Sequence, residues 1–132
     1  GYGVIFNGGV VGRIKEVDSK SSEVEFITNP TFRIIGHFEG DTRPITFQGN
    51  GIGFGGKPQG LVTDVPHDIS VSPEKPLSIV TSNLGGNFPQ GIPIGMVYEL
   101  EEGGNGLFKA GKVLLNRKLN EIREVAILQG EL

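Results

Sequence analysis

Short runs of alternating apolar and polar residues extend along the chain, and glycine, asparagine or proline bounds each run. In residues 23–27, for example, Val24 and Phe26 share one face of an extended segment and two glutamates share the other. An apolar period of 3.6 residues does not persist for three turns anywhere, so long helices are not expected. The pattern predicts an all-β chain, with strands at residues 4–6, 10–17, 23–27, 32–38, 43–48, 60–65, 78–82, 92–101, 107–115 and 125–128.

The stretch from residue 78 to residue 95 predicts two strands joined by a tight loop. Asn83 and the loop glycines can adopt the positive φ angles that a sharp reversal of the chain requires. Phe88 stands between turn formers, so we expect it to pack into the end of a barrel. The residues expected to shape this turn and the nearby strand corners are Asn83, Gly86, Phe88, Pro89, Gly91, Gly95 and Gly12.

A weak internal repeat relates residues 11–17 to residues 94–100. Each copy begins with an apolar residue and a glycine, Gly12 or Gly95, and a glycine within a strand commonly marks a bulge or a barrel corner. Duplication would give two small antiparallel six-stranded-type β-barrels packed together. Chance similarity is the alternative, because glycine and valine are common in this chain.

The repeat suggests a division of the chain into two parts. We expect residues 1–65 to form a first barrel portion, to which a missing upstream segment contributes, and residues 66–132 to form a second barrel. The closing strand, residues 122–129, could return to the first barrel. Because the chain has no initiator methionine, we expect it to be a fragment of a longer protein.

Composition supports the all-β interpretation and narrows the possible functions. The 132 residues include 22 glycines and 8 prolines, which suits many short strands joined by turns. The net charge is −3 and there is no basic block, so nucleic acid is not an expected partner. There is no cysteine, which excludes disulfides and thiol chemistry, and no apolar run approaches the roughly 20 residues of a membrane span.

The candidate chemical motifs favour a structural interpretation. Residues 51–56, GIGFGG, fit the spacing of a dinucleotide-binding loop, but the Lys-Pro-Gln-Gly that follows cannot begin a helix. His67 and Asp68 are adjacent in an extended segment, so their side chains point to opposite faces and cannot form a catalytic pair. The two histidines lack zinc-ligand spacing. We therefore expect no catalytic residue, no metal and no cofactor.

Large apolar residues on faces that should meet water indicate a partner-binding surface instead. Met96 and Tyr98 occupy the repeat positions at which the first copy has Arg13 and Lys15. Exposed apolar patches of this kind usually mark a contact with another protein. Further candidates are Phe47 and Phe54. The alternative is that these side chains cover a groove between the two barrels.

The same residues resemble the two signature blocks of the MreC family of rod shape-determining cell-wall proteins. Matches to the first block, in residues 8–30, are Val11-Gly12-Arg13 and Thr28-Asn29-Pro30. Matches to the second block, in residues 78–101, are Val80-Thr81-Ser82, Gly86, Phe88-Pro89-Gln90-Gly91 and Ile94-Gly95. The chain departs from the family pattern at Asn83, Met96 and Lys75-Pro76, where glycine, a basic residue and Gly-Asp are usual.

The resemblance implies a non-enzymatic scaffold on the periplasmic face of the bacterial inner membrane, anchored by a segment absent from this chain. It implies binding to the elongation-specific penicillin-binding transpeptidase, with MreD, MreB and RodA in the wider complex. It also implies self-association of the full-length protein through a coiled coil that this chain lacks. Two alternatives stay open: a periplasmic adaptor-type binding module of an envelope transport system, and a degenerate trypsin-like hydrolase.

Overall fold

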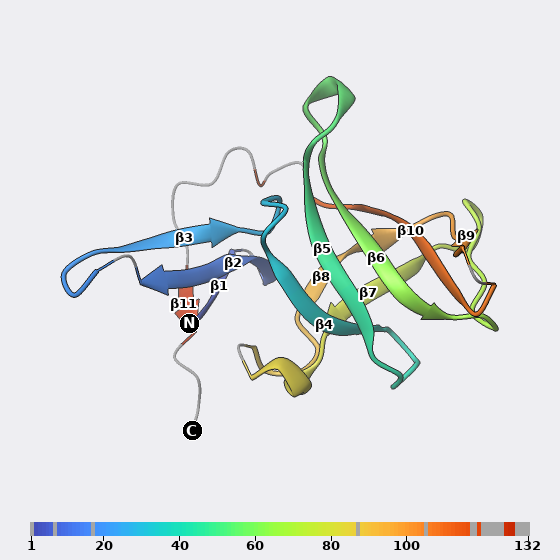
Figure 1. Cartoon of the computed structure of the whole chain (residues 1–132), viewed down its shortest axis with the longest axis horizontal. Coiled ribbons are helices and arrows are strands. Elements are labelled where there is room, and N and C mark those ends of the chain that lie inside the picture. The colour runs from blue at the N-terminus through green and yellow to red at the C-terminus, as the bar shows by residue number, and fades with distance from the viewer. Residues whose placement is uncertain are drawn as a thin grey trace.

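The residues that the structure describes form β-strands joined by turns and short 3₁₀ segments (Figure 1). The computed structural model describes residues 2–6, 8–16, 18–86, 88–104, 106–116, 119 and 126–128. Its strands are β1 (Gly3–Phe6), β2 (Gly9–Glu16), β3 (Ser22–Phe26), β4 (Arg33–Phe38), β5 (Ile45–Ile52), β6 (Pro58–Pro66), β7 (Leu77–Thr81), β8 (Pro93–Val97), β9 (Glu101–Glu102), β10 (Phe108–Leu114) and β11 (Ala126–Leu128). The 3₁₀ turns are η1 (Phe54–Gly56) and η2 (Asn83–Gly85).

Six of the strands form a closed antiparallel barrel. Their order is β6-β5-β4-β7-β8-β10, and pairing between β6 and β10 closes the ring. The short strand β9 extends the edge of β10. Closure leaves no unpaired strand at the joint, which removes the exposed edges that an open sheet would present. This barrel confirms one of the two predicted barrels.

The remaining strands form an open sheet in the order β11-β1-β2-β3, which lies beside the barrel in Figure 1. The prediction of a second closed barrel is therefore wrong for the described residues. The physical reason lies in the pairing: among the described residues, the outer strands β11 and β3 do not pair with each other, so the sheet does not close. The open sheet adjoins the barrel, because Val10 of β2 and Ile27, just after β3, belong to the apolar cluster of the barrel.

The boundary between the two units also differs from the predicted division after residue 65. Strands β4, β5 and β6 precede that residue and belong to the barrel, so the open sheet takes only residues 3–26 from the first half of the chain. Strand β11 pairs with β1 at the edge of the open sheet. The two units are thus joined by chain crossings at both ends of the barrel segment.

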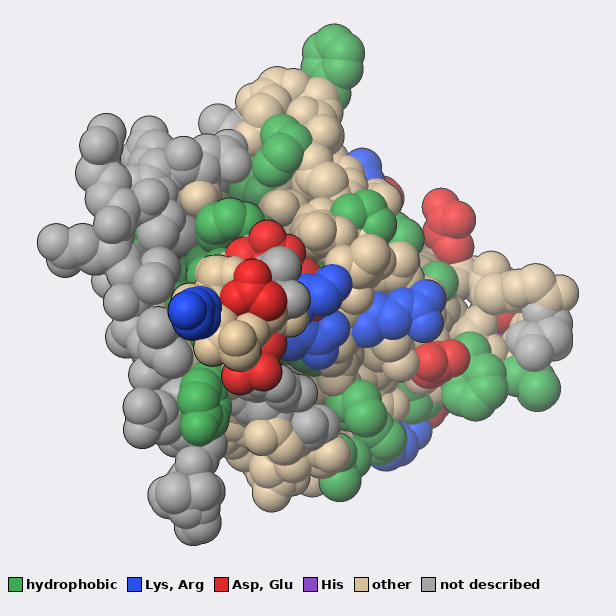
Figure 2. Space-filling view, turned by 60° about the vertical axis from the view of Figure 1, so that its left-hand side comes forward, with side chains coloured by type: hydrophobic (Ala, Val, Ile, Leu, Met, Phe, Trp, Pro, Cys, Tyr) green, Lys and Arg blue, Asp and Glu red, His purple; other side chains and the backbone are tan. Residues whose placement is uncertain are grey.

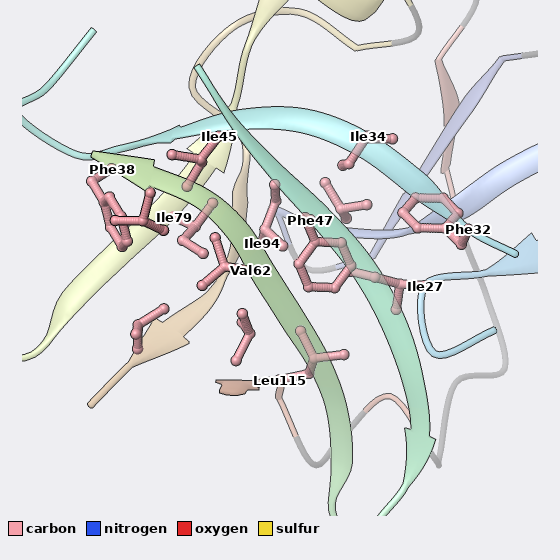
Figure 3. Close-up of a cluster of buried hydrophobic side chains, with 14 of the residues drawn as sticks. Ile27, Phe32, Ile34, Phe38, Ile45, Phe47, Val62, Ile79, Ile94 and Leu115 are labelled. Carbon is pink, nitrogen blue, oxygen red and sulfur yellow. The ribbon is translucent and has the colours of Figure 1, made fainter. Parts of the chain in front are cut away.

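The barrel interior follows from strict alternation along its strands. In β5, Ile45 and Phe47 are buried while the intervening Thr46 and Gln48 are half-buried. Figure 3 shows Phe47 inside the barrel, in the cluster that also holds Ile27, Val62 and Ile94. Position 60 must be glycine, because a Cβ there would lie 2.3 Å from the Phe47 ring. Packing of the core therefore requires the large side chain of Phe47 and the glycine at position 60 together.

Candidate partner-binding surface

The loop between β7 and β8 is held by one buried hydroxyl. Thr81 Oγ1 donates to the Pro89 carbonyl at 2.6 Å and accepts from the Ile92 amide at 2.8 Å. Phe88 is buried in the core cluster, as the sequence predicts. The predicted turn set is correct for Gly86 and Gly91, which have φ of 76° and 93°.

Two details of the predicted turn differ in the structure. Asn83 does not adopt a positive φ, because it begins η2 and the reversal is made by Gly86 at the end of that turn. Pro89 is exposed and contributes its carbonyl to Thr81. The buried hydroxyl of Thr81 is therefore used within the loop itself.

Gly12 and Gly95 occupy corners where two backbones approach closely. A Cβ at Gly12 would lie 2.2 Å from the carbonyl oxygen of Glu25, and one at Gly95 would lie 2.8 Å from that of Leu114. Neither glycine has a positive φ, so the requirement is space and not conformation. The repeat thus marks equivalent tight corners in the open sheet and in the barrel.

Met96 and Tyr98, the two main predicted contact residues, are partly exposed and line surface grooves. A first groove of about 490 Å³ lies between the open sheet and the barrel, with Phe6 and Val10 on one side and Met96 on the other. The alternative interpretation expected a groove between two barrels, whereas this groove lies between an open sheet and a barrel. Tyr98 lines the first groove and also a second groove on the barrel surface, so it stands between the two.

Leu114, which the sequence analysis did not single out, accompanies Tyr98 in both grooves. It is 37% exposed, next to the fully buried Val113. An apolar residue directly after an inward one on a strand must point outward, and that alternation was the available signal. We call Tyr98 and Leu114 together the apolar ridge.

The second groove, of about 620 Å³, combines apolar walls with an acidic rim. Its charged lining residues are Glu99, Glu101, Glu102 and Lys112. Glu102 also accepts from His67, whose Nε2 lies 3.0 Å from the carboxylate. Negative charge therefore exceeds positive charge beside the apolar ridge.

Phe47 cannot contact a partner, and its prediction as a contact residue is wrong. Its side chain is 0% exposed and packs edge-on against Phe32, with ring centroids 6.3 Å apart. In the sequence, the polar neighbours Thr46 and Gln48 suggest that Phe47 lies on a face that meets water. They are the outward residues of β5, and Phe47 alternates with them into the barrel.

Phe54 is fully exposed, as the sequence predicts, but it lies apart from the grooves. It belongs to η1 at the tip of the hairpin that joins β5 to β6 and lines neither groove. The GIGFGG run is thus a hairpin tip, as expected, and not a dinucleotide loop.

The repeat is a poor guide to the surroundings of its cationic positions. Lys15 is exposed, but Arg13 is only partly so. The Arg13 guanidinium binds Glu25 at 2.7 Å, donates to the Arg33 carbonyl at 3.2 Å and lies 5.1 Å from the centre of the Phe32 ring. Arg13 therefore links the open sheet to the barrel, whereas Met96 lines a groove.

A few other charged residues form surface ion pairs. Arg43 binds both Asp41 and Asp68 at the end of the barrel. Hydrogen bonds from Arg43 lower the pKa of Asp41 to about 2. Asp68 therefore faces Arg43 while His67 faces Glu102, which agrees with the prediction that these adjacent residues do not form a catalytic pair.

Among the described residues, no three histidine or acidic side chains are grouped in a way that could hold a metal ion. No helix in the described part of the chain is both long and apolar enough to cross a membrane. The grooves around the apolar ridge are therefore the candidate site that geometry supports.

Comparison with known sequences gives a consistent match. The family "Rod shape-determining protein MreC, barrel core" matches residues 1–129. The cell shape-determining protein MreC of Haemophilus influenzae is 30% identical over 129 residues, covering 97% of this chain and 35% of that protein. MreC of Listeria monocytogenes is 24% identical over 136 residues, covering 92% of this chain and 40% of that protein. The chain thus spans less than half of each relative.

Solved structures show the same fold. Pseudomonas aeruginosa MreC has a TM-score of 0.75 at 22% identity, covering 96% of this chain and 78% of that one. A structure described as a complex between penicillin-binding protein PBP2 and MreC from Helicobacter pylori gives 0.65 at 15% identity, covering 87% and 66%. A major periplasmic domain of MreC gives 0.60 at 22% identity, covering 86% and 67%. Because the family match covers nearly all of its length, this chain belongs to the MreC family of rod shape-determining proteins and forms the family's barrel core.

Proposed function

We propose that this chain is a non-enzymatic docking module of the bacterial cell-elongation machinery, on the periplasmic face of the inner membrane. Its partner is the elongation-specific penicillin-binding transpeptidase. Support comes from relatives: the family is described as determining rod shape, one similar domain is described as periplasmic, and the Helicobacter pylori structure holds MreC in complex with PBP2.

The observation that carries the proposal is the apolar ridge of Tyr98 and Leu114 between two grooves. Aromatic side chains flanked by concave surface are the usual anchors of protein interfaces. A specific interface buries roughly 800 Å² on each partner. The two grooves and the ridge between them provide a continuous surface on which Tyr98 holds a central position, and Met96 extends it toward the open sheet.

The acidic rim adds a second property to this surface. Glu99, Glu101 and Glu102 border the second groove, with Lys112 as the opposing charge. Charges at the rim of an interface act mainly on the rate of encounter and on the choice of partner. The complementary face of the transpeptidase therefore combines an apolar centre with basic residues around it.

For the whole protein, of which this chain is a part, the proposal includes a larger assembly. MreD, MreB and RodA are the further partners, and a membrane anchor and a coiled coil for self-association lie outside this chain. The open sheet is the first barrel portion, which another segment of the longer protein completes. This accords with two relatives more than twice as long as the region they share with this chain.

The test is replacement of Tyr98 by alanine and measurement of affinity for the purified transpeptidase by calorimetry. Removing an anchor of this kind typically costs about 2 kcal/mol or more, which is roughly a thirtyfold loss of affinity. Leu84→Ala is the matched control, because Leu84 is 66% exposed and lines neither groove. It should bind like the unchanged chain.

The melting temperature separates the two ways in which the proposal could fail. Tyr98→Ala should melt close to the unchanged chain, because Tyr98 is not part of the buried cluster. Unaltered affinity at an unaltered melting temperature would refute the assignment of the ridge. Equal losses from Tyr98→Ala and Leu84→Ala would move the contact to another face.

A further inference from the structure

The hairpin that joins β5 to β6 carries an apolar tip that the grooves do not explain. Figure 1 shows this hairpin projecting beyond the barrel, and its ladder continues as far as the pair Ile52 and Pro58. Phe54 at the tip has a relative exposure of 101%, and Ile52 is 53% exposed. Figure 2 shows a hydrophobic side chain standing clear of the surface at this end of the molecule.

Single exposed apolar residues are common, so the surroundings of Phe54 decide what its exposure means. Residues 51–56 contain only glycine, isoleucine and phenylalanine and offer no polar side chain. Anchors in protein interfaces are normally ringed by residues that exclude water and supply hydrogen bonds. The tip has no such ring, which favours a partner that solvates apolar groups without requiring specific polar contacts.

The charged residues of the hairpin also favour such a partner. No aspartate or glutamate occurs in residues 42–63, although the whole chain has a net charge of −3. The only charged residues of that segment are Arg43, which is engaged by Asp41 and Asp68, and Lys57 directly beside the tip. The apolar tip is therefore accompanied by one cation and by no carboxylate.

The backbone of the tip is compatible with a poorly hydrated environment. The Gly53 amide donates to the Lys57 carbonyl at 2.7 Å, and the Gly56 amide donates to the Gly53 carbonyl at 3.1 Å. Gln59 packs against Gly53, where a Cβ would lie 1.8 Å from Gln59 Nε2. Backbone groups that are bonded internally avoid the large cost of entering lipid unpaired.

We propose that this tip, residues 52–57, binds the surface of an anionic lipid bilayer. Phe54 and Ile52 enter the boundary between headgroups and acyl chains, and Lys57 contacts lipid phosphates. Aromatic rings favour this boundary, and a basic residue near an anionic surface strengthens attachment. The site is separate from the grooves, so it does not depend on the proposed function.

The test uses the absence of tryptophan from this chain. Phe54→Trp places a single fluorescent reporter at the tip, and Leu84→Trp places one at an exposed site on the β7–β8 loop. Each variant is titrated with vesicles of equimolar phosphatidylcholine and phosphatidylglycerol, and then with vesicles that contain brominated acyl chains. We expect a blue shift and quenching for Phe54→Trp and neither change for Leu84→Trp.

A second pair of measurements tests the role of charge. Adding Lys57→Gln to the Phe54→Trp reporter should weaken vesicle binding about fivefold, because one basic residue near the surface contributes about that factor. Vesicles of phosphatidylcholine alone should bind the reporter more weakly than the anionic mixture.

Three results would overturn the proposal. The first is an unchanged Phe54→Trp spectrum with anionic vesicles. The second is an equal response from Leu84→Trp, which would show non-specific adsorption. The third is a blue shift caused by the purified transpeptidase and not by vesicles, which would assign the tip to a protein contact.

Discussion

At the scale of single residues, Thr81 shows how one hydroxyl fixes the loop between β7 and β8. It is completely buried, and its oxygen bonds to backbone groups at the far end of the loop. Its own backbone is also paired there, since its amide donates to the Ile92 carbonyl and its carbonyl accepts from Gly91. Position 81 therefore requires a small side chain that can both donate and accept.

Thr81→Val should lower the free energy of unfolding by about 1–3 kcal/mol, because it leaves the Pro89 carbonyl and the Ile92 amide without this partner. Valine has nearly the same shape, so the effect reports the hydroxyl. Urea denaturation measures it, and Thr42→Val at an exposed position is the control. Equal stability of the two variants would mean that water replaces the hydroxyl.

The sequence predicts some of these residues and not others, for local reasons. The burial of Phe88 can be predicted, because a single large apolar residue between turn formers is expected to pack into the barrel end. Phe47 was misplaced because Thr46 and Gln48 are compatible with either face until the neighbouring strands are known. The contact of Arg13 with Phe32 and Arg33 joins residues 19 and 20 positions apart in the printed sequence, and no local pattern carries that information.

At the scale of elements, the pairing of β8 with β10 depends on Gly95. A Cβ at this position would lie 2.7 Å from Val113 Cγ1 and 2.8 Å from the Leu114 carbonyl oxygen. The second of these atoms belongs to the backbone of the facing strand and cannot move independently of the ladder. Space at Gly95 thus sets how closely the two strands approach beneath the apolar ridge.

Gly95→Ala should destabilise the fold by about 1–3 kcal/mol through overpacking. Gly104→Ala is the matched control, because a Cβ there meets nothing within 4 Å and Gly104 has no positive φ. Thermal unfolding of both variants distinguishes them. If Gly95→Ala and Gly104→Ala have the same melting temperature, β8 and β10 can move apart without cost, and the assignment of Gly95 to a tight corner is wrong.

The strands themselves were largely predictable, because alternation and turn residues are local signals. The predicted runs 23–27 and 78–82 lie within one residue of β3 and β7 at each end. The sequence predicts one strand over residues 92–101, where the structure has β8 and the two-residue strand β9. Nothing in Tyr98, Glu99 or Leu100 marks the break between these two strands. A Cβ at Gly111 would lie 2.4 Å from the Glu99 carbonyl oxygen, so the chain there passes close against β10.

At the scale of the whole molecule, a polar cluster fastens the open sheet to the barrel. Glu25 of β3 binds Arg13 and accepts from the Thr31 hydroxyl. Arg33 of β4 binds Gln48 at 2.8 Å, and the Gln48 amide donates to the Pro30 carbonyl at 2.9 Å. Figure 2 shows acidic and basic side chains gathered together on this side of the molecule.

Stability should depend on pH through Glu25. The Thr31 hydroxyl, and then Arg13, hold the pKa of Glu25 below its ordinary value of 4.5. Because the pKa of Glu25 is lower in the folded state, the charged carboxylate stabilises the fold fully above pH 4.5. This stabilisation is lost as the pH falls through the lower folded-state pKa.

Glu25→Gln should therefore melt below the unchanged chain at neutral pH, and the difference should shrink as the solution becomes more acidic than pH 4.5. Melting temperatures of both chains across this range provide the measurement. Glu23→Gln, at an exposed neighbour on the same strand, is the control and should show a smaller change. A constant difference at all pH values would exclude the titration of Glu25 as its cause.

The closure of the sheets was the least predictable feature. A second barrel was expected from the repeat, but a repeat of local sequence does not specify which strands meet. The barrel closes because Gly60 and Val62 of β6 pair with Val113 and Gly111 of β10, about 50 residues later in the chain. The open sheet has no such distant partner beyond β11 among the described residues, so it ends at β3.

The pairing of β1 with β11 has a consequence for the synthesis of the protein. Gly3, Val4 and Ile5 are made before their partners Leu128, Ile127 and Ala126, which follow about 120 residues later in the chain. At about 5–20 residues per second, one edge of β1 waits roughly 6–25 s for its neighbour. A chain released early would keep that edge open, where it could be recognised by proteases and chaperones. Completion of this sheet therefore distinguishes a chain that has reached β11 from one that was terminated before it.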